Sequence, residues 1–98
     1  MKLELKKIGT TLSSRPAGKE ALSALMPTLR SLKENEILEI DFSEIYSLSP
    51  SWADEFLTPL RDRFGDRLVL LPSDNLSVTE TVKFLEEIGG KRFNKKSE

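Results

Sequence analysis

The sequence contains neither cysteine nor histidine. Without cysteine, the chain can form no disulfide, thiolate metal site or thiol nucleophile. Without histidine, it lacks the most common general base and the most common metal ligand. Any catalysis would have to use carboxylates, lysine or hydroxyl groups. We therefore expect a protein that is not an enzyme and that holds no cofactor and no metal.

Long apolar runs and an excess of one charge are also missing. No segment approaches the roughly 18 apolar residues of a membrane span, and the first seven residues alternate charged with apolar side chains, unlike a signal peptide. The 15 lysines and arginines nearly balance the 16 acidic residues, and the net charge is −1. We therefore expect a cytoplasmic protein with no membrane and no nucleic-acid partner. Lys91-Arg92 with Lys95-Lys96 forms a small basic cluster near the C-terminus.

Glycine is scarce, and the five glycines form no phosphate-binding loop. Gly65, Gly89 and Gly90 match neither a Walker pattern nor a dinucleotide fingerprint. Gly18-Lys19 lacks the upstream glycine that a phosphate cradle needs. The common nucleotide-binding loops are therefore excluded.

The spacing of apolar residues predicts strands that alternate with helices. The predicted strands lie at about residues 3–8, 37–42 and 68–71, and the predicted helices at about 16–33, 50–64 and 77–88. This β-α-β-α-β-α order implies parallel strands joined by right-handed crossovers. We expect a small α/β domain, with a mostly parallel sheet of three to four strands packed with helices. The strand at 37–42 is mostly apolar and is expected to be buried on both faces.

Residues 1–90 are predicted to form this single domain, and residues 91–98 a polar, disordered C-terminal tail. Ser77 with Glu80 has the pattern of a capping box for the third helix. Pro27 and Pro59 fall inside predicted helices, where proline kinks or locally opens the helix.

Ser49-Pro50-Ser51 predicts the start of the second helix. Ser49 is placed to accept hydrogen bonds from free amides of the first turn, and Pro50 fits the first helical position. Ser51 would expose its hydroxyl at a helix N-terminus beyond a central strand, a location that collects ligands and modifications in α/β sheets. Trp52 is either a core residue or a partly exposed anchor for a partner. Arg15 either pairs with the acids of this region or is solvated.

Four acidic residues near this turn raise the alternative of a metal or acid-base site: Asp41, Glu44, Asp54 and Glu55. Asp54 and Glu55 lie in the first turns of the predicted helix, where the helix dipole favours negative charge. We prefer this structural interpretation, because no spacing among the four demands a metal.

The segment from Ile40 to Phe56 resembles the signature of the STAS-like family of domains of unknown function. In that signature a strand ends in Asp-Phe, as at Asp41-Phe42 here. A Ser-x-Ser-aromatic-Ala-Asp-Glu run then opens a helix, as at residues 49–55. Upstream, Ser14-Arg15 with Gly18 is similar to the Ser-Arg that precedes the first helix of the family. The resemblance extends from about residue 13 to residue 88.

The wider relatives of this family are anti-sigma-factor antagonists and the STAS domains of anion transporters. When this chain is aligned without gaps to the strand, loop and helix of the antagonists, their Asp-Ser-Ser-Gly motif aligns with residues 49–52. The serine that is phosphorylated in those antagonists then corresponds to Ser51. The resemblance thus implies a switchable docking surface for a GHKL-type ATPase or kinase. This chain departs from the pattern with Ser49 and Trp52, and the charges of Asp54 and Glu55 would repel a phosphate.

Our leading hypothesis is a non-enzymatic regulatory module that binds a protein partner through the loop and start of the second helix. The partner-binding residues predicted for this surface are Arg15, Ser49, Ser51, Trp52, Asp54 and Glu55, with Ser51 the candidate for phosphorylation. The alternative is a domain that binds a nucleotide, a phosphate or another small anion at the same helix N-terminus. A metal-dependent enzyme ranks third, and nucleic-acid binding through the basic C-terminal cluster ranks last.

Overall fold

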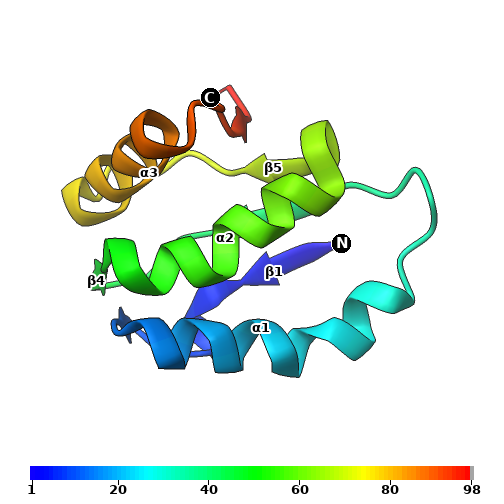
Figure 1. The fold of residues 1–98 in the computed structure, drawn as a ribbon, viewed down its shortest axis with the longest axis horizontal. Helices are drawn as coiled ribbons and strands as arrows, with labels where there is room; N and C mark the ends of the chain where they lie inside the picture. Colours follow the sequence, from blue (N-terminus) through cyan, green and yellow to red (C-terminus); the bar gives the residue numbers. More distant parts are fainter. Residues whose placement is uncertain (98) are drawn as a thin grey trace.

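The computed structural model describes residues 1–97 and shows a parallel sheet with three helices (Figure 1). The strands are β1 (Lys2–Glu4), β2 (Thr11–Leu12), β3 (Leu38–Asp41), β4 (Ser47–Leu48), β5 (Leu68–Leu70) and β6 (Asn94–Lys95). The α-helices are α1 (Arg15–Arg30), α2 (Pro50–Phe64) and α3 (Leu76–Gly89), and short 3-10 turns lie at η1 (Leu5–Lys7) and η2 (Gly65–Arg67). The α/β class and the mostly parallel sheet are therefore confirmed.

The main sheet has the order β1-β3-β5-β6, and β2 pairs with β4 in a separate parallel ribbon. Figure 1 shows α2 in front of the sheet, between α1 and α3. Leu38 and Ile40 of β3 are fully buried, whereas Glu39 between them is partly exposed and pairs with Lys96 at 3.5 Å. The prediction that this strand is buried on both faces is wrong, because the helices cover only one face of the sheet.

Each helix begins at a side-chain cap. Ser49 caps α2 as predicted, and Ser14 Oγ accepts a hydrogen bond from the Ala17 amide at the start of α1. The predicted Ser77–Glu80 capping box is wrong, because Asn75 caps α3 and the Ser77 hydroxyl accepts a hydrogen bond from the backbone amide of β4 instead. Helices α1 and α2 both continue past their internal prolines. Within residues 1–97, no helix has the length and apolar character that crossing a membrane requires.

Helices α1 and α2 approach each other at Gly18. A Cβ atom at this position would lie 2.4 Å from the Trp52 carbonyl oxygen of α2. Only glycine allows this approach, since real Cβ atoms essentially never come within 3.0 Å of another heavy atom. The contact places the first turns of the two helices side by side.

Gly18→Ala is expected to lower the free energy of unfolding by about 1–3 kcal/mol, because the added methyl group must push the two backbones apart. The matched control is Gly9→Ala, whose new Cβ would meet the Leu12 side chain at an ordinary 3.4 Å. Urea denaturation measures both. Equal effects of the two substitutions would show that the helices do not depend on this contact.

The segment after α3 differs from the expected disordered tail. β6 pairs with β5, and the Phe93 side chain is 4% exposed beneath the Arg61 guanidinium, 4.7 Å from the ring centroid. Arg61 lies on α2, is itself buried, and donates a hydrogen bond of 3.0 Å to the Lys91 carbonyl oxygen. Phe93 is the only apolar residue between positions 91 and 98. Its burial anchors a segment whose polar composition had predicted disorder.

Phe93→Ala is expected to cost about 3–4 kcal/mol of unfolding free energy, since it leaves a cavity under Arg61 and removes the anchor of β6. Its neighbour Arg92 is exposed, and Arg92→Ala should change stability by less than about 0.5 kcal/mol. Thermal and urea unfolding test the pair. A small effect of Phe93→Ala would contradict the ordered C-terminal strand.

Candidate functional site

The first turns of all three helices gather at one end of the molecule, next to β4 (Figure 1). We call residues Ser49 to Glu55 the α2 start. The ribbon of β2 and β4 leads into it, and the Ser49 amide donates a hydrogen bond of 2.8 Å to the Leu12 carbonyl oxygen. Backbone hydrogen bonds therefore connect the α2 start to the β2–β4 ribbon, independently of any side chain.

The hydrogen bonds of Ser49 are those of a helix cap. Its hydroxyl accepts from the Trp52 amide at 3.2 Å, and its carbonyl accepts from the Ala53 amide at 3.0 Å. Pro50 has no N–H. Within this first turn the Ser51 amide is the one N–H with no acceptor among the described residues, and the Ser51 side chain is exposed. Ser49 thus acts structurally, and Ser51 is the serine accessible to another molecule.

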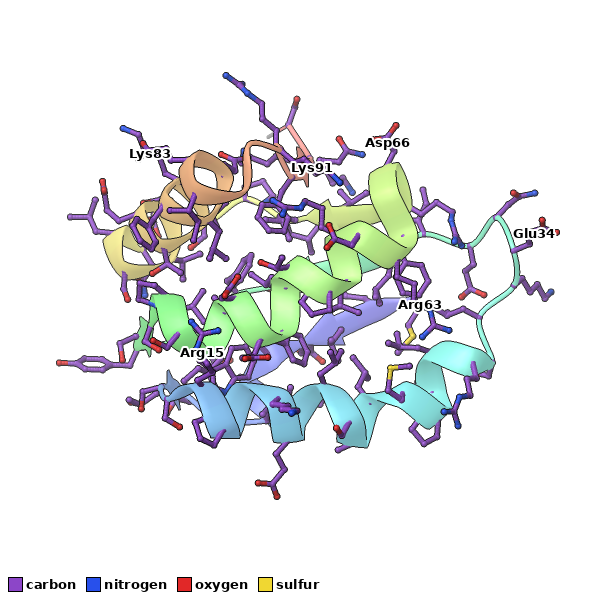
Figure 2. All side chains as sticks on the ribbon, in the orientation of Figure 1. Arg15, Glu34, Arg63, Asp66, Lys83 and Lys91 are labelled. Atoms are coloured by element: carbon purple, nitrogen blue, oxygen red, sulfur yellow. The ribbon has the colours of Figure 1, made fainter. Side chains whose placement is uncertain are left out.

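Arg15 connects the starts of α1 and α2. Its Nη1 lies 2.9 Å from Asp54 Oδ2 and 3.1 Å from Glu55 Oε1, and Figure 2 shows it between the two helices. The structure thereby selects the ion-pair interpretation of Arg15 over the solvated one. The Thr58 hydroxyl donates to Asp54 as well, so this carboxylate is fixed from two sides.

The Arg15 ion pairs shift the pKa values of Asp54 and Arg15. The hydrogen bond from Arg15 lowers the pKa of Asp54 below its ordinary 3.8, and outweighs the opposing effect of partial burial. Hydrogen bonds to Asp54 and then to Glu55 raise the pKa of the Arg15 guanidinium above its ordinary value. Asp54 and Arg15 are therefore charged at neutral pH, and the two carboxylates of Asp54 and Glu55 share one arginine.

The four acids that raised the possibility of a metal or acid-base site do not come together. The Ser43 hydroxyl and amide donate to Asp41, and both lower its pKa. Glu44 pairs with Lys6, whereas Asp54 and Glu55 pair with Arg15. In the described part of the chain, no three acidic side chains are grouped closely enough to hold a metal ion.

Trp52 belongs to the core. It is 2% exposed, and its ring stacks on Phe56 with a centroid distance of 4.7 Å. The structure thus favours the core interpretation of Trp52 over that of an exposed anchor, because a partner could reach the ring only if the helix moved. Its role at the α2 start is to fix the helix that presents Ser51.

Two exposed apolar residues beside the α2 start were missed by the sequence analysis. Tyr46, which precedes β4, is 81% exposed, and Leu76, the first residue of α3, is 75% exposed. The Asn75 side-chain amide donates to the carbonyl oxygens of Ile45 and Tyr46, at 2.7 and 3.4 Å, and so joins the two segments. The alternation in the sequence could have indicated Tyr46, since Ile45 and Leu48 point inward and leave it outside.

The family model described as a STAS-like domain of unknown function matches residues 28–75. Over these residues the chain is similar to a STAS-like domain. The matched residues include β3, β4, α2 and β5, and with them the whole α2 start, whereas Arg15 and Gly18 lie outside the match. No curated protein and no solved structure matches the chain.

The stability of the domain should fall in acid, and Asp54 should account for part of the fall. A carboxyl group with a lowered pKa in the folded state contributes stability above its unfolded pKa and loses it as pH falls through the folded pKa. We expect the free energy of unfolding to drop between about pH 5 and pH 2. Asp54→Asn should make this drop shallower, and Asp41→Asn should do the same independently.

Urea denaturation across this pH range tests the prediction. The control is Asp66→Asn, because Asp66 is exposed on the η2 turn and far in sequence from the α2 start. An Asp54→Asn profile parallel to that of the original chain would show that the Arg15 ion pair does not stabilise the fold.

Proposed function

We propose that this STAS-like domain is a non-enzymatic regulatory module that binds a protein partner through the α2 start. The observation that carries the proposal is the exposed Ser51 on a fixed helix start, beside the exposed side chains of Tyr46 and Leu76. Large apolar side chains that remain in water next to a polar rim are typical of protein-binding surfaces. Tyrosine in particular is enriched where proteins meet.

The rigidity of the α2 start supports the same function. The Ser49 cap, the Gly18–Trp52 contact and the two Arg15 ion pairs hold this segment in one conformation. A surface that is already ordered loses little conformational entropy on binding, so more of the contact energy appears as affinity. Arg15, Asp54 and Glu55 thus belong to the proposed surface as the groups that shape and charge it.

Ser51 is the proposed site of phosphorylation, and the resemblance to anti-sigma-factor antagonists suggests a GHKL-type ATPase or kinase as the partner. A phosphate would add nearly two negative charges one helical turn from Asp54 and Glu55. It would compete with them for Arg15, which is the only cation paired with either acid among residues 1–97. Phosphorylation would therefore weaken the tie between α1 and α2, and the cytoplasm is the compartment where such a partner would act.

The α2 start is less suited to the alternative of a nucleotide or phosphate ligand. Anion sites at helix N-termini use several free amides. Here Pro50 has none, the amides of Trp52 and Ala53 are bonded to Ser49, and only that of Ser51 remains. Two carboxylates in the same turn would also repel an anion. A protein surface fits these groups better.

Site-specific photo-crosslinking in the source cells is the first test. A photoreactive residue replaces Tyr46 in one variant and Ser51 in a second. It replaces Ser23, an exposed residue on α1, in a control. We expect the same partner to be captured from positions 46 and 51 and not from position 23. Capture from position 23 alone, or equal capture from all three, would contradict docking at the α2 start.

The captured protein is then purified and its affinity for the domain measured by calorimetry. Tyr46→Ala and Ser51→Glu should each weaken binding about 10-fold or more, because they remove an aromatic contact and add a charge at the interface. Ser23→Glu adds the same charge elsewhere and should leave the affinity unchanged. Unaltered affinity of both interface variants would overturn the proposal.

A further inference from the structure

A second surface with exposed apolar side chains lies on the C-terminal half of α3. Figure 1 shows α3 at one edge of the layer of helices, with α2 beside it. The inward side chains Val78, Val82 and Leu85 are 1–5% exposed and belong to the core. Phe84 and Ile88, by contrast, are 46% and 60% exposed. These two large apolar side chains therefore remain partly in water.

Phe84 and Ile88 form a continuous apolar ridge. They are four residues apart on one helix, so their side chains lie on the same face, about one turn from each other. Glu80 is exposed and continues the same row one turn earlier. Rows of residues with this spacing are the ridges by which helices most commonly pack on one another. The ridge thus has the geometry of a helix-packing surface, but no helix of residues 1–97 covers it.

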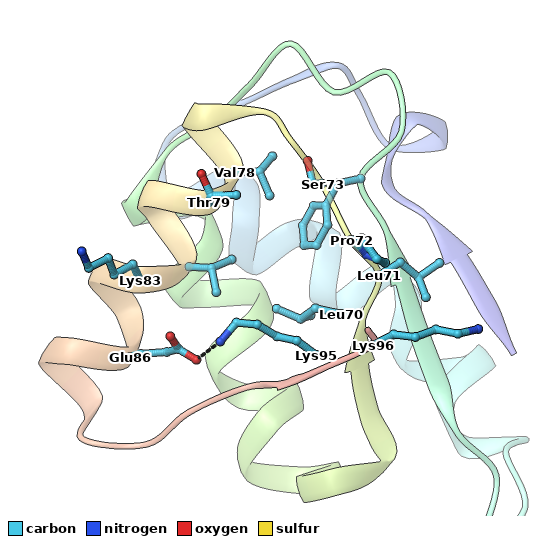
Figure 3. A pocket seen from close by; sticks show the side chains of 12 residues that line it. Leu70, Leu71, Pro72, Ser73, Val78, Thr79, Lys83, Glu86, Lys95 and Lys96 are labelled. Atoms are coloured by element: carbon cyan, nitrogen blue, oxygen red, sulfur yellow. Dashed lines mark hydrogen bonds and ion pairs between the residues drawn. The ribbon is translucent and has the colours of Figure 1, made fainter. Parts of the chain in front are cut away.

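A charged row runs beside this ridge. Lys83 and Glu87 are both exposed, and they too are four residues apart. Figure 3 shows the Lys83 side chain pointing away from the domain, whereas Glu86 of the same helix is paired with Lys95. Within residues 1–97, neither Lys83 nor Glu87 takes part in an ion pair. We call the two rows together the α3 outer face: Glu80, Lys83, Phe84, Glu87 and Ile88.

The arrangement of the two rows matches a second copy of the same helix. Successive residues of an α-helix are separated by about 100° around its axis, so the apolar row lies on one flank of the outer face and the charged row on the other. In an antiparallel pair related by a two-fold axis, each flank meets the same flank of the other copy. Apolar side chains then meet apolar side chains, and charges meet charges. A parallel pair would instead place the apolar row against the charged row.

The charges of the outer face are complementary in such an antiparallel pair. With the two-fold axis near Leu85, a residue that precedes Leu85 faces the residue of the second copy that follows it by the same number of positions. Lys83 of each copy therefore lies opposite Glu87 of the other, and two equivalent ion pairs form. The same axis brings Phe84 of each copy to Phe84 and Ile88 of the other. One register thus satisfies both the charged row and the apolar row.

We propose that two copies of this domain associate through the α3 outer face, with their α3 helices antiparallel. The interface is small because each copy contributes one helix, so the association belongs to the weak and reversible class. The outer face includes neither Tyr46 nor Leu76 nor any residue of the α2 start. The proposal stands independently of the proposed function, since the association of two copies is measured without any other protein.

Sedimentation equilibrium of the purified chain measures the association. We expect a monomer–dimer equilibrium with a Kd of about 100 μM. Ile88→Lys places a charge in the apolar row and should weaken the dimer about 10-fold or more. The matched control is Ile37→Lys, because Ile37 is also an exposed isoleucine but precedes β3, and it should leave the Kd unchanged. A chain that stays monomeric up to about 1 mM, or equal losses in the two variants, would overturn the proposal.

Charge reversal tests the antiparallel register. Lys83→Glu alone, or Glu87→Lys alone, places like charges opposite each other at both contacts and should weaken the dimer about 10-fold at low salt. An equimolar mixture of the two variants has opposite charges at both contacts, so it should form mixed dimers with nearly the original affinity. The control mixture combines Lys19→Glu with Glu20→Lys, two exposed positions on α1, and should behave as the original chain does. Mixed dimers no tighter than those of either α3 variant alone would contradict the antiparallel pair.

Discussion

The contact between Gly18 of α1 and the Trp52 carbonyl of α2 is the constraint on which the rest of this structure depends. Because no side chain separates the two backbones there, the first turns of the helices lie side by side. Arg15, three residues before Gly18, is thereby brought to Asp54 and Glu55. The same contact orients α2 so that the Trp52 side chain points into the core and the Ser51 side chain points into solvent. The burial of Trp52 and the exposure of Ser51 thus both follow from the close approach of the two helix backbones.

Local signals made much of the fold predictable. Alternating strand and helix patterns gave the parallel α/β class, and Ser49-Pro50 gave the start of α2 to the residue. The errors arose where distant segments meet. β6 is ordered because Phe93 packs under Arg61, about thirty residues away, and β3 has one open face because all the helices lie on the other. A local pattern cannot show either of these tertiary contacts.

In the candidate site too, some features follow from the local sequence and others depend on contacts between distant segments. The cap formed by Ser49 and the exposure of Ser51 follow from helix geometry, and the sequence indicated both. Arg15 required the structure, since ion pairing and solvation are equally compatible with its position in the sequence. Trp52, which the sequence left open as a core residue or a partner anchor, lies in the core. Tyr46 became part of the candidate site only because the structure shows it 81% exposed.

Docking at the α2 start is the central claim, and amide hydrogen exchange on the complex with the captured partner tests it most directly. The Ser51 amide has no acceptor within residues 1–97, so it should exchange rapidly in the free domain. Binding should slow exchange at Ser51 and around Tyr46 and leave the open face of the sheet, at Glu39 and Val69, unchanged. Protection confined to that open face, with Ser51 still exchanging rapidly, would contradict the account.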